Sequence, residues 1–364
     1  MSPVDFFSLT PVDLAHLLQD RYGEPSYRAH QLLEWVYKKG RRDFDGMTNI
    51  SRELREKLQD EICFSEAKIV ERKISLDGTR KYLIDLGEFV AKRTVSAGVG
   101  GRALVEAVMI KQPRRMTLCL SSQVGCGMAC AFCMTGTMGF VAHLSESQII
   151  RQLLAVAEDS RQFGDSFSNI VFMGMGEPLH NFENLKRALL ILNSPYAFDI
   201  GPRKITVSTS GLLPEIKRFF DESLGANLAV SLNATDDEVR SKIMPVNKRY
   251  NLNALLELVR GLPLGKRKTI TFEYVMLAGV NDREEDLNRL PELLNGLPVK
   301  LNLIPYNSNG GLGFEPPSAS KVSEWQKTLS MMGIVTTVRW SKGGDIAAAC
   351  GQLVSAAKRS DLVH

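Results

Sequence analysis

From Met116 onward the sequence repeats one pattern, in which a short strand candidate is followed by a turn and then by an apolar helical run. Strands and helices that alternate in this way form a parallel sheet with right-handed crossovers. We therefore expect an α/β fold that is a barrel or part-barrel, with an open doubly wound sheet as the alternative. The strands are predicted at 117–121, 170–173, 204–208, 228–232, 269–276, 300–304 and 335–339.

The chain has 364 residues, more than an ordinary single domain, so a smaller unit should accompany the barrel. Residues 1–95 are predicted to form a helical accessory domain that ends in a hairpin. Its first helix should begin after the N-cap Thr10 and end at Gly23, and two further helices should start near residues 26 and 51. The Asp77-Gly78 pair between two strand-like runs marks the hairpin turn.

Three further segments complete the predicted organisation. Residues 96–111 form a linker and a strand that carries Glu106, residues 112–345 form the core barrel, and residues 346–364 form a C-terminal segment that carries Cys350. The glycine-rich run at 96–101 is not followed by the lysine and hydroxyl residue of a phosphate-binding P-loop, so we interpret it as a flexible boundary.

Composition excludes several protein classes. With 44% hydrophobic and 24% charged residues and no apolar run long enough to cross a bilayer, the sequence is typical of a soluble globular protein. The start of the chain has no signal-peptide pattern, so we expect a cytoplasmic protein. In a reducing compartment its six cysteines are better explained as ligands or catalysts than as a disulfide framework.

Three cysteines, Cys126, Cys130 and Cys133, follow the first predicted barrel strand at spacings of four and three residues. Structural zinc usually has four protein ligands, and no fourth cysteine is near. Three thiolates suit a 4Fe-4S cluster that keeps one iron open for another ligand. The alternatives are a zinc site completed by His143, a disulfide, or a chance group of buried thiols.

Polar motifs also follow the later strands. They are GMGEP at 174–178, STSG at 208–211, SLNA at 231–234 and PYN at 305–307. Functional residues of a barrel collect at the carboxyl ends of its strands, which favours a binding role for these motifs. Each motif has a simpler interpretation as a tight turn or a helix N-cap.

The cysteine motif, with Phe132 before its last cysteine, resembles that of the radical S-adenosylmethionine (SAM) enzymes. Together with TLCLSSQVGC, MGMGEPL, STSG, MPVNKRY, LNLIPYN and GGDIAAACGQL, it makes the chain similar, nearly end to end, to the RlmN-type methyltransferases of the RlmN/Cfr family. The resemblance implies a partial TIM-type (β/α)6 radical SAM barrel. It also implies that Cys126, Cys130 and Cys133 bind the cluster. The cofactor contacts that it implies are Gly176, Glu177, Ser208, Ser231, Leu232, Asn233 and Asn307.

The resemblance further implies methylation of carbon-2 of an adenine in 23S rRNA and in tRNA, with two SAM molecules per turnover. Cys350 would first receive a methyl group, a SAM-derived radical would activate that group, and the carbon would add to adenine. Cys119 would then release the product through a transient disulfide with Cys350. Glu106 is the matched base for the substrate proton, and Cys119 is the rival base. From their local sequence alone, either cysteine could be a packed core residue.

The resemblance has one clear departure, because many relatives carry histidine where this chain has Asn233. An amide can still donate and accept hydrogen bonds, so the exact cofactor contact stays open. The run at 87–104 is also longer than in typical relatives and has no assigned role.

We expect an RNA base to be flipped into the site while cationic and aromatic residues grip the backbone. The candidate grip in the N-terminal unit consists of Trp35, Tyr37, Lys38, Lys39, Arg41 and Arg42. Other short basic sets are Arg114 and Arg115, Lys248 and Arg249, and 266–268, although any one set alone is better explained as a solvated surface.

A reductase-type electron donor and a monomeric, membrane-free protein complete these expectations. Three alternative functions remain open: Cfr-type methylation of adenine carbon-8, a metal-stabilised RNA-binding protein without catalysis, and a radical enzyme for a small molecule.

Overall fold

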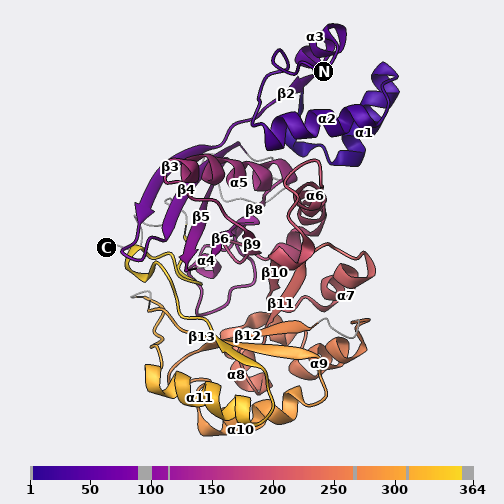
Figure 1. Ribbon diagram of the computed structural model, residues 1–364. Helices are drawn as coiled ribbons and strands as arrows, with labels where there is room; N and C mark the ends of the chain where they lie inside the picture. The colour runs from indigo at the N-terminus through magenta and orange to yellow at the C-terminus, as the bar shows by residue number, and fades with distance from the viewer. Residues whose placement is uncertain (1–2, 89–100, 114, 265–268, 309–310, 355–364) are drawn as a thin grey trace.

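The structure, a computed structural model, describes residues 3–88, 101–113, 115–264, 269–308 and 311–354 (Figure 1). The expected boundary at 96–101, except for Gly101, the basic set 266–268, Arg114 and the end of the C-terminal segment lie outside the described residues. Within the part of the chain that is described, no helix is long and apolar enough to cross a membrane.

A ten-stranded sheet organises the described residues, and seven of its strands are parallel. These are β6 (Arg115–Cys119), β9 (Asn169–Phe172), β10 (Ile205–Thr209), β11 (Asn227–Ser231), β12 (Ile270–Met276), β13 (Val299–Pro305) and β14 (Thr336–Val338). Each pairs with the next in chain order. All seven overlap the predicted strands. The first six are each followed by helix, which confirms six strand–helix units, and β14 adds a short parallel edge strand.

The crossover helices surround the sheet on its outer side (Figure 1). They are α5 (Glu146–Arg161), α6 (Phe182–Asn193), α7 (Leu213–Asp221), α8 (Asp237–Ile243), α9 (Leu252–Gly261), α10 (Glu284–Leu294) and α11 (Ala319–Met331). Side chains from all seven parallel strands line one cavity of about 920 Å³, so the strands curve around a polar lumen. The fold is therefore the partial barrel and not a flat doubly wound sheet.

Three antiparallel strands extend the sheet beyond β6. They are β5 (Arg102–Gln112), β4 (Arg80–Glu88) and β3 (Lys68–Ile74). The Asp77-Gly78 turn joins β3 to β4, as predicted, and Gly78 has a positive φ of 82°. The hairpin expected at the end of the N-terminal helical unit is thus continuous with the barrel sheet.

The N-terminal helices form a small unit packed on α5 and α6. It contains α1 (Pro11–Tyr22), α2 (Tyr27–Leu33), a π-helical turn (Glu34–Lys38), α3 (Arg52–Glu61) and the parallel pair β1 (Val4–Asp5) and β2 (Ile62–Cys63), with the 3-10 turn η1 (Phe6–Ser8) between β1 and α1. Thr10 and Asp13 form the expected capping box, and Gly23 ends α1 in the left-handed conformation. An ion pair of 2.8 Å joins Asp13 to Arg187 of α6.

Of the residues expected to grip RNA, Tyr37 belongs to the core of this unit. Its side chain is 8% exposed and its ring packs near Phe6, Phe7 and Phe198. Trp35 is only partly buried; its indole N–H donates to Asn49 at 2.5 Å, and the Lys39 ammonium lies 3.5 Å from its ring centre. The structure therefore places Tyr37 in the core and leaves Trp35 partly exposed.

A short excursion follows β6 and carries the cysteine motif. It contains β7 (Gln123–Gly125), α4 (Met134–Thr137) and β8 (Phe140–His143), with β7 and β8 paired antiparallel. A capping box formed by Ser145 and Gln148 then begins α5. The excursion places residues 126–133 over the carboxyl ends of the barrel strands.

Candidate active site

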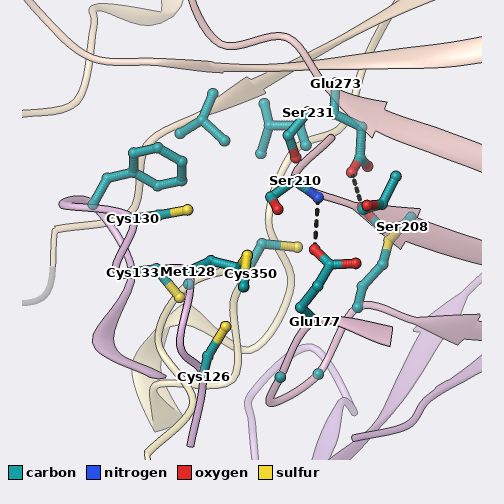
Figure 2. A pocket seen from close by; sticks show the side chains of 18 of the residues that line it. Cys126, Met128, Cys130, Cys133, Glu177, Ser208, Ser210, Ser231, Glu273 and Cys350 are labelled. Carbon is teal, nitrogen blue, oxygen red and sulfur yellow. Dashed lines mark hydrogen bonds between the residues drawn. The ribbon is translucent and has the colours of Figure 1, made fainter. Parts of the chain in front are cut away.

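A cavity of about 150 Å³ lies at the carboxyl ends of the parallel strands (Figure 2). It collects nine of the sequence-predicted site residues, although they come from distant parts of the chain. They are Cys126, Cys130, Cys133, Gly176, Glu177, Ser208, Ser231, Asn307 and Cys350. The apolar side chains of Phe132 and Val275 complete part of the wall. The arrangement supports one binding site fed by several loops.

The three motif cysteines occupy a tightly folded loop. Gly125 has a φ of +70°, and a β-carbon there would lie 2.0 Å from the Gly139 carbonyl oxygen, so only glycine fits at the start of the loop. The Cys126 N–H donates to that same carbonyl at 2.8 Å. Burial raises the pKa of Cys126 to about 12 and raises the pKa values of Cys130 and Cys133 as well. A cationic centre is therefore needed to keep these thiols ionised.

His143 does not complete a zinc site with these thiols. The side-chain amide of Gln123 contacts its Nδ1 at 3.0 Å and Nδ1 of His180 at 3.2 Å, away from the cavity wall. Among the described residues, no three His, Cys, Asp or Glu side chains converge closely enough for a single metal ion. A four-iron cluster spreads its protein ligands over a larger volume than one ion does. The geometry therefore disfavours the zinc alternative.

The GMGEP turn holds a buried carboxylate at the cavity. Oε2 of Glu177 accepts the Ser210 N–H at 2.7 Å (Figure 2). Oε1 of Glu177 accepts the Leu179 N–H at 3.0 Å. Burial raises the pKa of Glu177, although these backbone hydrogen bonds act in the opposite direction. A carboxylate in this position can bind an ammonium group that enters the cavity.

Gly176 is required by packing as well as by the turn. Its φ is +101°, and a β-carbon would lie 2.5 Å from Cβ of Gln123. Oε1 of Gln123 also accepts the Glu177 N–H at 2.8 Å. The turn and β7 are therefore pressed together, and this contact fixes the direction of the Glu177 side chain.

Two site residues escaped the sequence predictions. Glu273 lies in β12, and its Oε2 accepts the Ser208 hydroxyl at 2.7 Å. Ser210 also lines the cavity, and its side chain is close enough to the Glu177 carboxylate to lower the pKa of that group. The signals were an acid within the apolar strand TFEYVM and the third residue of the STSG motif. Both are weak signals without the fold.

Leu232 and Asn233, predicted as cofactor contacts, are not among the residues that line the cavity. Oδ1 of Asn233 accepts the Val275 N–H at 2.7 Å, and its backbone carbonyl accepts from Asn281 at 2.7 Å. Its φ of +56° is a conformation that asparagine tolerates better than most residues. In this structure Asn233 joins the end of β11 to the end of β12.

The two cysteines expected to react lie near each other. Cys119 ends β6 and is buried; burial, followed by the nearby Cys350, raises its pKa to about 12. An ionised Cys350 would also raise the pKa of Arg339, for which it is the largest single influence. Both cysteines are free thiols. Cys350 forms part of the cavity wall, whereas Cys119 is not among the residues that line it.

Glu106 lies in β5 and is not on the cavity wall. Its carboxylate is paired with Lys81 at 3.2 Å, and Oε2 accepts the Val354 N–H at 2.9 Å. Both charged side chains are almost fully buried. As a base, Glu106 would have to exchange one of these contacts for the substrate.

The barrel lumen approaches the cavity from below. Met173 and Glu273 line both spaces, so the lumen and the cavity meet at these two side chains. Arg115, Lys204, Arg339 and Lys342 also line the lumen, which gives it an excess of positive charge over Glu273. The combined space leads an anionic or polar group toward Cys350.

Comparison with known proteins identifies the family. The Ribosomal RNA large subunit methyltransferase N-terminal domain family matches residues 4–64, and the Radical SAM superfamily matches residues 120–290. The Dual-specificity RNA methyltransferase RlmN 2 of Myxococcus xanthus is 45% identical over 362 residues, covering 97% of this chain and 91% of the relative. The Dual-specificity RNA methyltransferase RlmN of Geotalea uraniireducens is 43% identical and covers 97% of both chains.

A solved structure agrees with this assignment. A radical SAM methyltransferase from Sphaerobacter thermophilus has a TM-score of 0.85 and 38% identity, covering 96% of this chain and 99% of that one. The N-terminal match, the superfamily match and the end-to-end relatives all indicate the same enzyme class. The chain therefore belongs to the RlmN family of radical SAM RNA methyltransferases.

Proposed function

We propose that this enzyme methylates carbon-2 of an adenine in 23S rRNA and in tRNA, with Cys350 as the methyl carrier. The observation that carries the proposal is the position of Cys350, which lines one cavity together with Cys126, Cys130 and Cys133. Relatives across the whole chain are named dual-specificity RNA methyltransferases, which supports RNA as the substrate. The carbon-2 position and the pair of RNA classes come from the resemblance of the motifs.

The residues present fit a 4Fe-4S cluster and SAM. Cys126, Cys130 and Cys133 would hold the cluster, and their loop leaves the cavity side open. Glu177 would bind the cofactor's ammonium group, and the neighbouring Ser210 side chain offers a polar atom on the same wall. When bound, the cluster supplies one electron to the sulfonium of SAM.

Gly176, Ser208, Ser231 and Asn307 would complete the SAM contacts from the cavity wall. Ser208 is already hydrogen-bonded to Glu273, so that pair would act as one unit toward a ribose or base. We propose that Leu232 and Asn233 act mainly through the backbone that they hold. Their hydrogen bonds to β12 and its neighbours support this role.

The two cysteines divide the chemistry. The Cys350 thiolate takes a methyl group from one SAM by displacement, releasing S-adenosylhomocysteine. After the carbon is joined to adenine, the adduct must lose the carbon-2 proton to a base and one electron to a one-electron acceptor, and the Cys119 thiolate then attacks the Cys350 sulfur. The sulfur–carbon bond breaks, its electron pair stays on the carbon, and a proton completes the new methyl group. A disulfide between Cys119 and Cys350 remains, and a thiol reductant must supply two electrons before the next turnover.

Glu106 is our candidate base for the adenine proton, provided that its carboxylate leaves the Val354 N–H. The N-terminal unit is our candidate grip on RNA, through Trp35, Lys38, Lys39, Arg41 and Arg42. The Lys39 ammonium over the Trp35 ring is a cation and an aromatic group presented together, which suits a nucleic acid. The electron donor, the monomeric state and the cytoplasmic location stay predictions from the sequence.

The test is anaerobic incubation of the reconstituted enzyme with SAM, a reductant and unmodified RNA, followed by mass spectrometry of the digested RNA. We expect 2-methyladenosine. A carbon-8 product would replace the proposed position, and no methylated adenosine in either RNA would overturn the proposal. A Cys119→Ala variant should trap RNA covalently on Cys350, whereas Cys350→Ala, the matched control, should trap none.

A further inference from the structure

The segment 343–354, which we call the Cys350 segment, follows an irregular path. Within it the regular structure is one short 3-10 turn, η6 (Gly344–Ile346). Three of its residues have positive φ: Gly343 at 68°, Ala347 at 52° and Gly351 at 80°. No strand ladder holds this part of the described chain. Its position must therefore be set by individual hydrogen bonds with other elements.

The β3–β4 turn makes the first set of these contacts. The Asp345 carboxylate accepts the Ser75 hydroxyl at 2.6 Å and the Leu76 N–H at 3.1 Å. In the opposite direction, Oδ2 of Asp77 accepts the Gly343 N–H at 3.0 Å. The turn and the Cys350 segment thus each supply a carboxylate that accepts hydrogen bonds from the other, so charge-assisted hydrogen bonds run in both directions between them.

The buried pair of Lys81 and Glu106 makes the second set. The Lys81 ammonium donates to the Ala347 carbonyl at 2.9 Å, and Glu106 accepts the Val354 N–H at 2.9 Å. These two contacts lie three residues before and four residues after Cys350. Lys81 and Glu106 are buried and form an ion pair. If the segment moved away, each of these charged groups would lose one of its buried hydrogen-bond partners, which is unfavourable.

The cysteine loop closes the other side. The Met134 N–H donates to the Gly351 carbonyl at 2.8 Å, and the Thr135 hydroxyl donates to the Leu353 carbonyl at 2.7 Å. Both donors come directly after Cys133. The Cys350 segment is therefore held between β4 and β5 on one side and the cysteine loop on the other.

We propose that Ser75, Asp77 and Lys81 are positioning residues that dock the Cys350 segment and so set the place of the Cys350 thiol in the cavity. The docking itself stands on the geometry, while its catalytic consequence rests on the proposed methyl-carrier function. The thiol must meet SAM, adenine and Cys119 in turn. Because the hairpin already holds the segment in place, less conformational entropy is lost when the thiol meets the first of these partners.

Asp345 offers the cleanest perturbation because it is exposed, so its removal should leave the fold intact. Losing its hydrogen bonds in Asp345→Ala should raise the undocked population by roughly tenfold. The measurement is hydrogen–deuterium exchange of the reconstituted enzyme, read by mass spectrometry on a peptide that spans 343–354. We expect the amide exchange rate of this peptide to rise by about the same factor. Asp60→Ala, which removes an exposed acid from α3, is the matched control and should exchange like the parent.

The catalytic readout is methylation of Cys350 by labelled SAM without RNA. In Asp345→Ala the rate at saturating SAM should fall while the affinity for SAM stays unchanged, and Asp345→Asn should recover part of the rate because its amide oxygen still accepts. A Ser75→Ala, Asp345→Ala double variant should be no worse than the Asp345→Ala single variant, since the Ser75–Asp345 hydrogen bond is already lost in the single variant.

Unchanged exchange in Asp345→Ala would overturn the docking. Faster exchange with an unchanged methylation rate would overturn the positioning role. If the parent enzyme itself never methylates Cys350, the proposed function fails, while the exchange result still decides the docking.

Discussion

Arg240 is a buried cation whose replacement should loosen the cofactor site and the barrel together. Its guanidinium donates to the carbonyl oxygens of Leu232, Ser231 and Ser210 at 2.9, 3.0 and 3.1 Å. Two further hydrogen bonds reach Oδ1 of Asn247 at 2.8 Å and the carbonyl of Tyr250 at 3.3 Å. All five acceptors are uncharged, and burial lowers the pKa of Arg240 to about 10. One side chain thus joins the ends of β10 and β11 to the 245–250 turn.

The expected cost follows from these contacts. A hydrogen bond to a charged group contributes about 1.5–3 kcal/mol, but the five act as one network and their values do not add. Because the acceptors are neutral, Arg240→Met strands no charge but leaves buried oxygens without a donor, which costs about 1–3 kcal/mol for a buried group. We expect Arg240→Met to lose that much free energy of unfolding. Because the Ser210 and Ser231 backbones line the SAM cavity, we also expect about tenfold weaker SAM binding.

The assay is guanidinium denaturation followed by circular dichroism, with SAM affinity measured by equilibrium dialysis on the reconstituted protein. Arg240→Lys keeps the charge but has only three donors, so it should fall between the parent and Arg240→Met. Arg260→Met removes an exposed arginine from the end of α9 and should match the parent. If Arg240→Met lies within about 1 kcal/mol of the parent, and SAM binding is unaltered, the network has no such role.

Three other perturbations test separate parts of the account. Gly176→Ala places a β-carbon 2.5 Å from Cβ of Gln123 at a φ of +101°, so we expect the free energy of unfolding to fall by about 1–3 kcal/mol and SAM binding to become much weaker. Thermal unfolding and dialysis measure the two effects, and parent-like values would contradict the packing argument. Burial, with a smaller effect of His180, lowers the pKa of His143 to about 4. A histidine with a lowered pKa contributes stability above its unfolded pKa near 6.5, and about 1 kcal/mol of that stability, after solvent screening, is lost as pH falls toward 4. In His143→Gln the free energy of unfolding should therefore depend less on pH between 6.5 and 4. The same pH dependence in the variant and the parent would exclude His143 as its source. Lys39→Ala should weaken RNA binding and its salt dependence without changing SAM binding, measured by filter binding; unchanged RNA affinity would move the grip elsewhere.

The periodicity of the sequence predicted the barrel because each strand and helix carries its own local signal. The capping box of Thr10 and the turn at Asp77-Gly78 depend on residues close together in the chain, and both were predicted. The continuity of β3, β4 and β5 with the barrel depends on long-range pairing, which has no local signal. That continuity brings the hairpin to the Cys350 segment.

The site shows the same division between local and distant information. Cysteine spacing and the motif resemblance were enough to gather nine residues at one cavity. The roles of Glu273, which meets Ser208 across the barrel, and of Lys81, which meets Ala347, depend on partners far along the chain. Asn233 was assigned to the cofactor by motif position, while its contacts in the structure are with neighbouring backbone.

The most direct test of the central claim is a single incubation of the reconstituted enzyme with methyl-labelled SAM before any RNA is added. If Cys350 is the carrier that its place beside the cysteine loop suggests, peptide mass spectrometry will find the label on Cys350, and later addition of RNA will move that label into adenine. Label that reaches RNA from an enzyme whose Cys350 is unlabelled, or from Cys350→Ala, would contradict the account.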